Sequence, residues 1–154
     1  MTKKRNSKKE AFFKKLPKNL IENYLQNFEN KINFNFSFFD KTQGQDFKDW
    51  TEKQLSELLD KLKSYSKENL EHWKRLPKGR KSKVLAVYGT FPRKSMFKHP
   101  KYIPLDIDWA RFRLEGDSRL IGFIINNDDC NKHNICKYTF YVVFLDENHD
   151  FYKK

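Results

Sequence analysis

Four stretches of the chain have the apolar patterns of β-strands. Residues 32–39 alternate isoleucine and phenylalanine with asparagine and serine, which predicts a half-buried strand. Residues 108–114 and 119–125 flank a Glu-Gly-Asp-Ser sequence suited to a tight turn, which predicts a β-hairpin. Residues 138–145 are apolar on both faces, as in a central strand. The short apolar run at residues 84–88 is also compatible with a strand.

Helical spacing of apolar residues appears in two further regions. Residues 18–30 have one apolar stripe, which predicts an amphipathic helix. Thr51 and Gln54 have the spacing of a capping box, and leucines at helical spacing follow as far as Tyr65. A second helix or a continuation of the first covers residues 66–76. The element order predicts an α+β fold, with an antiparallel sheet of about four strands, helices packed on one face and a basic N-terminal helical extension.

The chain has 154 residues and a modest supply of apolar side chains, 38% hydrophobic against 34% charged. Its 15 Phe, 7 Tyr and 3 Trp offset this, because each buried ring removes a large area from water. We therefore expect one domain with a small aromatic core, residues 32–154. Residues 1–31 form a basic arm and an amphipathic helix outside it.

A strong positive charge favours a polyanionic partner. Lys and Arg number 32 against 20 Asp and Glu, which gives a formal net charge of +12. Residues 1–18 contain eight Lys or Arg and one Glu, and so hold +7 of that charge. This segment has two interpretations, an electrostatic arm for phosphates or a solubilising tail.

The sequence favours a cytoplasmic protein with no membrane partner. No apolar run approaches the roughly 20 residues that span a bilayer. The basic N-terminus lacks the apolar region of a signal peptide. Two cysteines make no disulfide framework, in agreement with a reducing compartment.

Three arginines converge on the predicted hairpin. Arg111 and Arg113 alternate with apolar residues and share one face of their strand, and Arg119 begins the return strand. A two-residue turn would place Arg119 on the opposite face, whereas a turn longer by one residue, or a bulge, would place all three together. The three arginines are candidates for an anion site, and the alternative is that they are solvated strand residues.

A basic loop mixed with aromatic residues precedes the hairpin. Cations near Phe97 and Tyr102 suit single-stranded nucleic acid, whose bases stack on rings and whose phosphates attract cations. A solvated loop with a few buried anchors would have a similar composition. The candidate RNA-binding residues are Arg93, Lys94, Lys98, His99 and Lys101.

Residues 126–137 contain a Cys-x2-His-x2-Cys arrangement, Cys130, His133 and Cys136. Cysteine and histidine bind zinc, and Asp128 or Asp129 would complete four ligands. Paired-cysteine sites use two clusters and the chain has one, so ordinary loop thiols are the simpler interpretation. We expect no metal and no other cofactor.

The element order and three short motifs resemble the RelE/YoeB/HigB superfamily of bacterial toxins. A strand and two helices precede three strands, with arginines on the middle hairpin and a His/Tyr pair near the C-terminal end. The resemblance covers roughly residues 32–152. Its closest similarities are Trp109-Ala-Arg-Phe-Arg, Arg119-Leu-Ile-Gly-Phe and Phe140-Tyr-Val-Val-Phe-Leu-Asp-Glu-Asn-His-Asp-Phe-Tyr152.

This resemblance implies a toxin of a type II toxin–antitoxin system, a metal-independent endoribonuclease that cuts mRNA in the ribosomal A site. It implies RNA, the ribosome and an inhibitory antitoxin protein as partners. It adds Lys98 and His99 as loop residues near the site, and it leaves Glu115 and Asp146 as candidates for the general base. The residues that it assigns to catalysis are Arg111, Arg113, Arg119, His149 and Tyr152.

The chemistry of RNA cleavage fits these residue types. Attack by the 2′-OH needs that hydroxyl deprotonated, the phosphorane charge stabilised and the 5′-oxygen protonated. Arginines offer fixed donors for the charge, and histidine exchanges protons near neutral pH. The alternative for His149 is an exposed residue without a role. A non-catalytic RNA- or ribosome-binding module, or a protein that docks an acidic partner, would need the cations but not His149.

Overall fold

The computed structural model describes residues 30–79, 82–125 and 138–153. The described elements belong to a compact unit, Lys31–Lys154. The predicted basic arm and helix in residues 1–29 lie outside the described residues, as does the Cys/His loop at 126–137.

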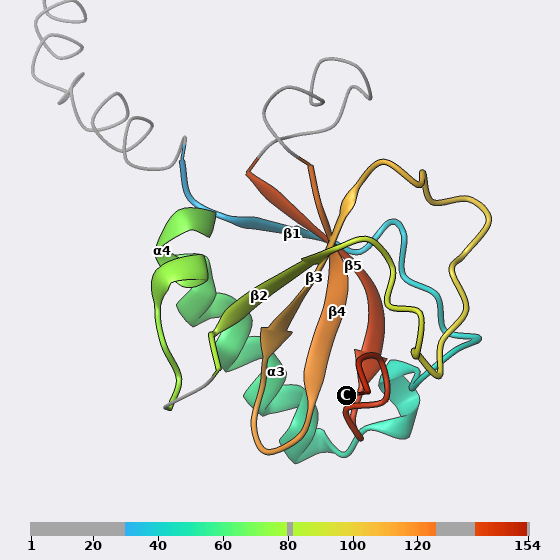
Figure 1. Ribbon diagram of the computed structural model, residues 1–154. Coiled ribbons are helices and arrows are strands. Elements are labelled where there is room, and N and C mark those ends of the chain that lie inside the picture. Colours follow the sequence, from blue (N-terminus) through green and yellow to red (C-terminus); the bar gives the residue numbers. More distant parts are fainter. Residues whose placement is uncertain (1–29, 80–81, 126–137, 154) are drawn as a thin grey trace, which may run out of the picture. The chain divides into compact units, whose positions relative to one another are not determined.

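The chain forms an α+β fold around a five-stranded mixed sheet with the strand order β1-β5-β4-β3-β2 (Figure 1). All four predicted strands belong to this sheet, as expected. The expectation of about four antiparallel strands is wrong in two respects, because β2 adds a fifth strand and β1 runs parallel to β5. The strands are β1 (Asn33–Asn35), β2 (Leu85–Gly89), β3 (Asp108–Arg113), β4 (Arg119–Ile124) and β5 (Thr139–Asp146).

The first strand is shorter than its alternating pattern predicts. After β1 the chain turns, because the Asn35 side chain accepts a hydrogen bond from the Ser37 N–H at 2.8 Å. After the turn, Phe38 packs against the opposite core, whereas Phe36 and Phe39 pack against the same core as Phe34. Phe34 packs against Phe112, with ring centroids 5.5 Å apart, whereas Phe38 packs against Phe123 at 5.3 Å. The predicted single buried face therefore holds for Ile32, Phe34 and Phe36 and is wrong at Phe38.

Two α-helices and one short 3-10 helix, η1 (Phe47–Asp49), follow β1. The predicted capping box opens α3 (Glu52–Tyr65): the Gln54 N–H donates to the Thr51 hydroxyl at 3.2 Å, and the Thr51 N–H donates to the Gln54 side chain at 2.8 Å. The second helix, α4 (Leu70–Arg75), is shorter than residues 66–76 because Asn69 caps its start.

Both faces of the sheet are buried. Helices α3 and α4 cover one face, and the segment between β2 and β3 crosses the other (Figure 1). The helix-facing core contains Tyr65, Trp73, Phe112, Leu120 and Phe140. The opposite core contains Phe97, Trp109, Phe123, Phe144 and Phe151.

A bulge in β5 determines which of its side chains face the opposite core. Ile121 pairs with Phe144, but its neighbour Gly122 pairs with Val142, so β5 has one extra residue here. A Cβ on Gly122 would lie 2.0 Å from the Tyr141 carbonyl oxygen, which explains the glycine. Beyond the bulge, the final residue of β5 lies directly opposite the first residue of β4.

Candidate functional site

The β3–β4 hairpin brings its three arginines to one face of the sheet. Arg113 pairs directly with Arg119, which corresponds to a turn one residue longer than the two-residue alternative. Arg111 is two residues from Arg113 on the same strand, so its side chain shares their face. Gly116 lies in the turn at φ 56°, in the left-handed region that favours glycine.

Two of these arginines are buried, which excludes the interpretation that all three are solvated strand residues. Arg111 is 8% exposed and Arg119 is 4% exposed. Arg119 Nη1 donates to the carbonyl oxygens of Gly116 and Ser118, at 2.9 and 2.7 Å. Nε of both buried arginines and Nη1 of Arg111 have no hydrogen-bond partner among the described residues. Buried donors on a cationic group are costly to leave unpaired, so the site is suited to an anion.

Repulsion among the three arginines adds to the effect that burial has on the pKa of Arg119. The pKa of Arg119 is lowered by burial, and then by the positive charges of Arg111 and Arg113. Arg113 is only partly buried, and its Nη1 donates to the Ser82 hydroxyl at 2.9 Å. An anion bound among the three would offset this repulsion.

The turn after β5 places His149, the predicted histidine, near the buried arginines. Asp146 is buried, and its carboxylate accepts hydrogen bonds from the N–H groups of Asp150 and Phe151, at 2.8 and 2.9 Å. Phe151 is fully buried in the opposite core and anchors the segment. His149, between these anchors, has a φ of 58°, which non-glycine residues seldom adopt.

His149 lies near enough to the arginines for their charge to affect its pKa. Its pKa is lowered by burial first and by Arg119 and Arg111 next, against the opposing effect of Asp146 and Asp117. The imidazole is therefore neutral at pH 7 and able to accept a proton.

Two tyrosines complete the cluster, and one of them was not predicted. The rings of Tyr88 and Tyr152 stack, with centroids 4.8 Å apart and an interplanar angle of 7°. Burial raises the pKa of Tyr88, and the nearby positive charge of Arg111 opposes that effect. Sequence reasoning treated Tyr88 as the end of an apolar run, and the adjacent Gly89 was the signal for a strand irregularity.

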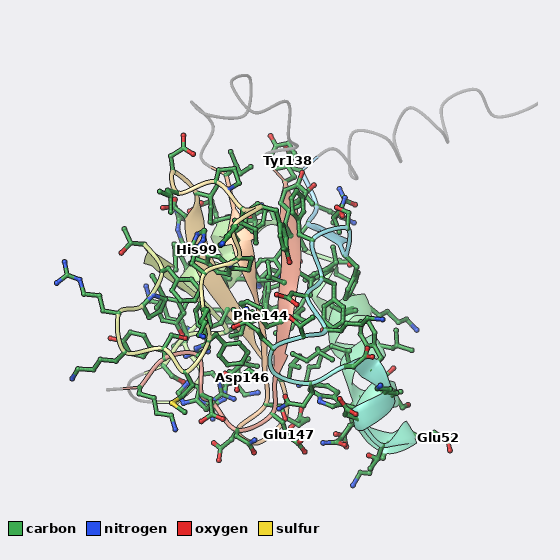
Figure 2. All side chains as sticks on the ribbon, turned by 90° about the vertical axis from the view of Figure 1, so that its right-hand side faces the viewer. Glu52, His99, Tyr138, Phe144, Asp146 and Glu147 are labelled. Carbon is green, nitrogen blue, oxygen red and sulfur yellow. The ribbon has the colours of Figure 1, made fainter. Side chains whose placement is uncertain are left out.

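The predicted RNA-binding loop divides into exposed cations and one packed histidine. The rings of Phe91 and Trp109 lie 5.3 and 5.5 Å from the His99 ring, whose Nε2 is buried without a partner among the described residues. In Figure 2, His99 lies away from Asp146 and Glu147, towards the other end of β5. The exposed cations are Arg93, Lys94, Lys98 and Lys101.

The two carboxylates considered as general bases are engaged elsewhere. Glu115, at the hairpin tip, forms an ion pair of 2.6 Å with Lys61, which lowers the pKa of the carboxyl. Asp146 uses both oxygens for the backbone of the C-terminal turn. His149 is thus a titratable group near the arginines whose side chain is neutral and able to accept a proton at pH 7.

No group of three or more His, Cys, Asp or Glu side chains that could hold a metal ion occurs within residues 30–79, 82–125 and 138–153. Cys130, His133 and Cys136 lie outside these ranges. Over the same ranges, neither length nor hydropathy qualifies any helix to cross a bilayer. No protein-family model, curated protein or solved structure matches the chain.

Proposed function

We propose that this protein is an endoribonuclease of the RelE-like type, a toxin that cleaves mRNA without a metal ion. The observation that supports this most is the cluster of Arg111, Arg113 and Arg119 beside a neutral His149 on one sheet face. Unpaired guanidinium donors suit the phosphodiester, and the histidine supplies proton exchange.

The cleavage step assigns one role to each group. His149 takes the proton from the 2′-OH, and the oxygen attacks the neighbouring phosphorus. Arg111 and Arg119 stabilise the charge that develops on the phosphorane oxygens. The bond from phosphorus to the 5′-oxygen breaks, and that oxygen takes a proton from water. The product is a 2′,3′-cyclic phosphate and a 5′-hydroxyl end.

The proposal includes partners of two kinds. The exposed cations of the 93–101 loop contact RNA or the ribosome, and the protein acts in the cytoplasm. A cognate antitoxin protein holds the toxin inactive. These assignments follow from the resemblance and from the net charge of +12.

The second candidate is a non-catalytic RNA- or ribosome-binding module. The exposed cations of the 93–101 loop favour it, because they are sufficient for phosphate contacts without any proton transfer. The two candidates differ in their dependence on His149, which only the enzyme needs.

Inducible expression in bacteria tests the proposal. We expect the wild type to arrest growth and fragment mRNA, while Arg119→Ala and His149→Asn do neither at equal protein levels. Asn is chosen because it tolerates the positive φ at position 149. Growth arrest with intact mRNA in all three strains would favour the binding module instead.

A further inference from the structure

Asp146 is a buried carboxylate at the end of β5, where the C-terminal turn begins (Figure 2). It is 1% exposed and lies directly opposite Arg119 in the β4–β5 ladder, so the two side chains share one face of the sheet. Both of its oxygens accept hydrogen bonds from the turn, from the N–H groups of Asp150 at 2.8 Å and of Phe151 at 2.9 Å. Hydrogen bonds to a carboxylate are stronger than those between neutral groups, so Asp146 holds the turn strongly.

The two hydrogen bonds close a loop over residues 147–150, and His149 lies within that loop. The loop is also fixed at its first residue, because the Glu147 N–H donates to Gln45 Oε1 at 2.7 Å. His149 itself has a φ of 58°, a conformation that persists in non-glycine residues only where the surroundings enforce it. Asp146 supplies part of that enforcement, because its two bonds determine where the chain leaves the turn.

The charges around His149 make its pKa a report on its position. Burial lowers this pKa most, followed by the positive charges of Arg119 and Arg111, while Asp146 and Asp117 oppose these effects. An imidazole released from the turn would leave its buried place and the arginines together, so its pKa would rise towards the ordinary value of about 6.5. An imidazole that stays in place but loses the charge of Asp146 would instead have a still lower pKa.

We propose that Asp146 is a positioning residue, which holds the C-terminal turn so that the His149 imidazole stays beside Arg111 and Arg119. It acts through the backbone N–H groups of the turn rather than on the reacting atoms. In the cleavage step His149 must lie within hydrogen-bond reach of the 2′-OH while the arginines bind the phosphate, and a small misplacement is costly in rate. This inference rests on the proposed function and adds the residue that keeps the proton acceptor aligned with the phosphate site.

Three variants of the full-length protein test this role. Asp146→Ala removes both hydrogen bonds, and Asp146→Asn keeps one acceptor oxygen in the same place. Asp150→Asn is the matched control, because it removes the same charge from the same turn, and the Asp150 side chain pairs with Lys153 at 2.7 Å. Circular dichroism shows whether each variant folds.

RNA cleavage measures the alignment of the site. We expect Asp146→Ala to lower kcat about a hundredfold with KM unchanged, because a misplaced base slows the chemical step and leaves the phosphate contacts in place. Asp146→Asn should recover part of the rate, to a loss of about tenfold, since one bond to the turn remains. Asp150→Asn should cleave at the wild-type rate. A wild-type kcat in Asp146→Ala would overturn the inference, as would an equal loss in Asp150→Asn.

The titration of His149 is a readout that does not depend on activity. The imidazole proton resonances of the four histidines are followed against pH by NMR, and the His149→Asn variant assigns the resonance of interest. We expect the pKa of His149 to rise towards about 6.5 in Asp146→Ala, to stay lower in Asp146→Asn and to match the wild type in Asp150→Asn. A fall of this pKa in Asp146→Ala would show that the imidazole had stayed in place, and would overturn the inference.

Cleavage and titration can fail separately. A wild type that cleaves no RNA would contradict the proposed nuclease, and the pKa of His149 in the variants would then decide the role of Asp146. If Asp146→Ala does not fold, Asp146→Asn decides the question: a kcat lowered about tenfold at unchanged KM supports the positioning role, and a wild-type kcat overturns it.

Discussion

Arg111 and Arg119 occupy positions that a stable sheet would normally fill with apolar residues. Each is largely buried, and Arg119 also faces Arg113 directly across the strand pair. Like charges directly opposite each other destabilise a sheet, and buried unpaired donors add to the cost. A bound anion would offset both costs, so we expect occupation of the site to stabilise the protein.

Inorganic phosphate should therefore stabilise the protein through Arg119. We expect phosphate to raise the Tm of the wild type, with about 2.7 kcal/mol of stabilisation at a hundredfold excess over Kd. The Arg119→Ala variant should lose this response, because the site then lacks one of its two buried guanidinium groups. Thermal unfolding at constant ionic strength provides the measurement.

The matched control for that variant is Lys53→Ala. Lys53 is an exposed cation on α3, and its removal changes the net charge equally. It should keep the full response to phosphate. Equal loss in both variants would show that phosphate acts on the overall charge of the protein.

His149 should make stability depend on pH. Its pKa in the folded protein is lowered, so protonation favours the unfolded chain. The stabilisation is complete above the unfolded-state pKa of about 6.5 and is lost as the pH falls below it. We expect the free energy of unfolding to decrease between about pH 7 and 5 more steeply in the wild type than in His149→Asn. Urea denaturation across this range tests the sign, and parallel slopes would contradict it.

Single-residue patterns predicted much of the site but not its full composition. Periodicity placed Arg111 and Arg113 on one face, and turn length left two possible positions for Arg119. The pairing of Arg113 with Arg119 decides between them. Tyr88 could not be assigned, because its direction depends on a bulge that the sequence marks only by Gly89.

At the scale of the elements, the C-terminal segment after β5 contributes two residues to the candidate site. It carries both His149 and Tyr152, and the buried ring of Phe151 attaches it to the opposite core. That ring packs against Phe91 and Trp109, with centroids 5.2 and 5.6 Å away. The precision of the site thus depends on aromatic packing outside it.

Truncating this anchor should affect stability and site together. We expect Phe151→Ala to lower the free energy of unfolding by about 3–5 kcal/mol, the usual cost of removing a buried phenylalanine ring. It should also abolish the response to phosphate. Leu105→Ala is the control, since Leu105 is 83% exposed and its truncation should cost little. Urea denaturation of the two variants checks the difference, and similar small costs would contradict the anchoring role.

Local signals predicted elements better than they predicted their pairing. The capping box at Thr51 was correct, as were the hairpin and the central strand, because each depends on neighbouring residues. The alternation at 32–39 was misleading, since a side-chain hydrogen bond at Asn35 ends the strand early. The parallel pairing of β1 with β5 joins the two ends of the unit, and no local pattern encodes that choice.

At the scale of the whole molecule, positive charge is concentrated in two places with different roles. In the proposed function the buried arginines supply a specific site, while residues 1–18, rich in lysine, hold +7 of the net +12. A lysine-rich segment of this kind contributes affinity for nucleic acid by releasing counterions, and it carries no sequence specificity.

Deleting residues 1–15 should therefore flatten the salt dependence of RNA binding. Each lost phosphate contact lowers the slope of log affinity against log salt by about 0.7 for a single strand. Fluorescence anisotropy over a range of salt concentrations measures the slope. An unchanged slope would assign the arm to solubility instead.

The central claim is that the arginine and histidine cluster cleaves RNA. The most direct test incubates purified protein with mRNA, with and without ribosomes, and maps the 3′ ends. We predict cyclic phosphate ends from the wild type and from Lys53→Ala, and a loss of about 10²–10³-fold in rate in Arg119→Ala and in His149→Asn. Cleavage at the wild-type rate by both of these variants would contradict the account.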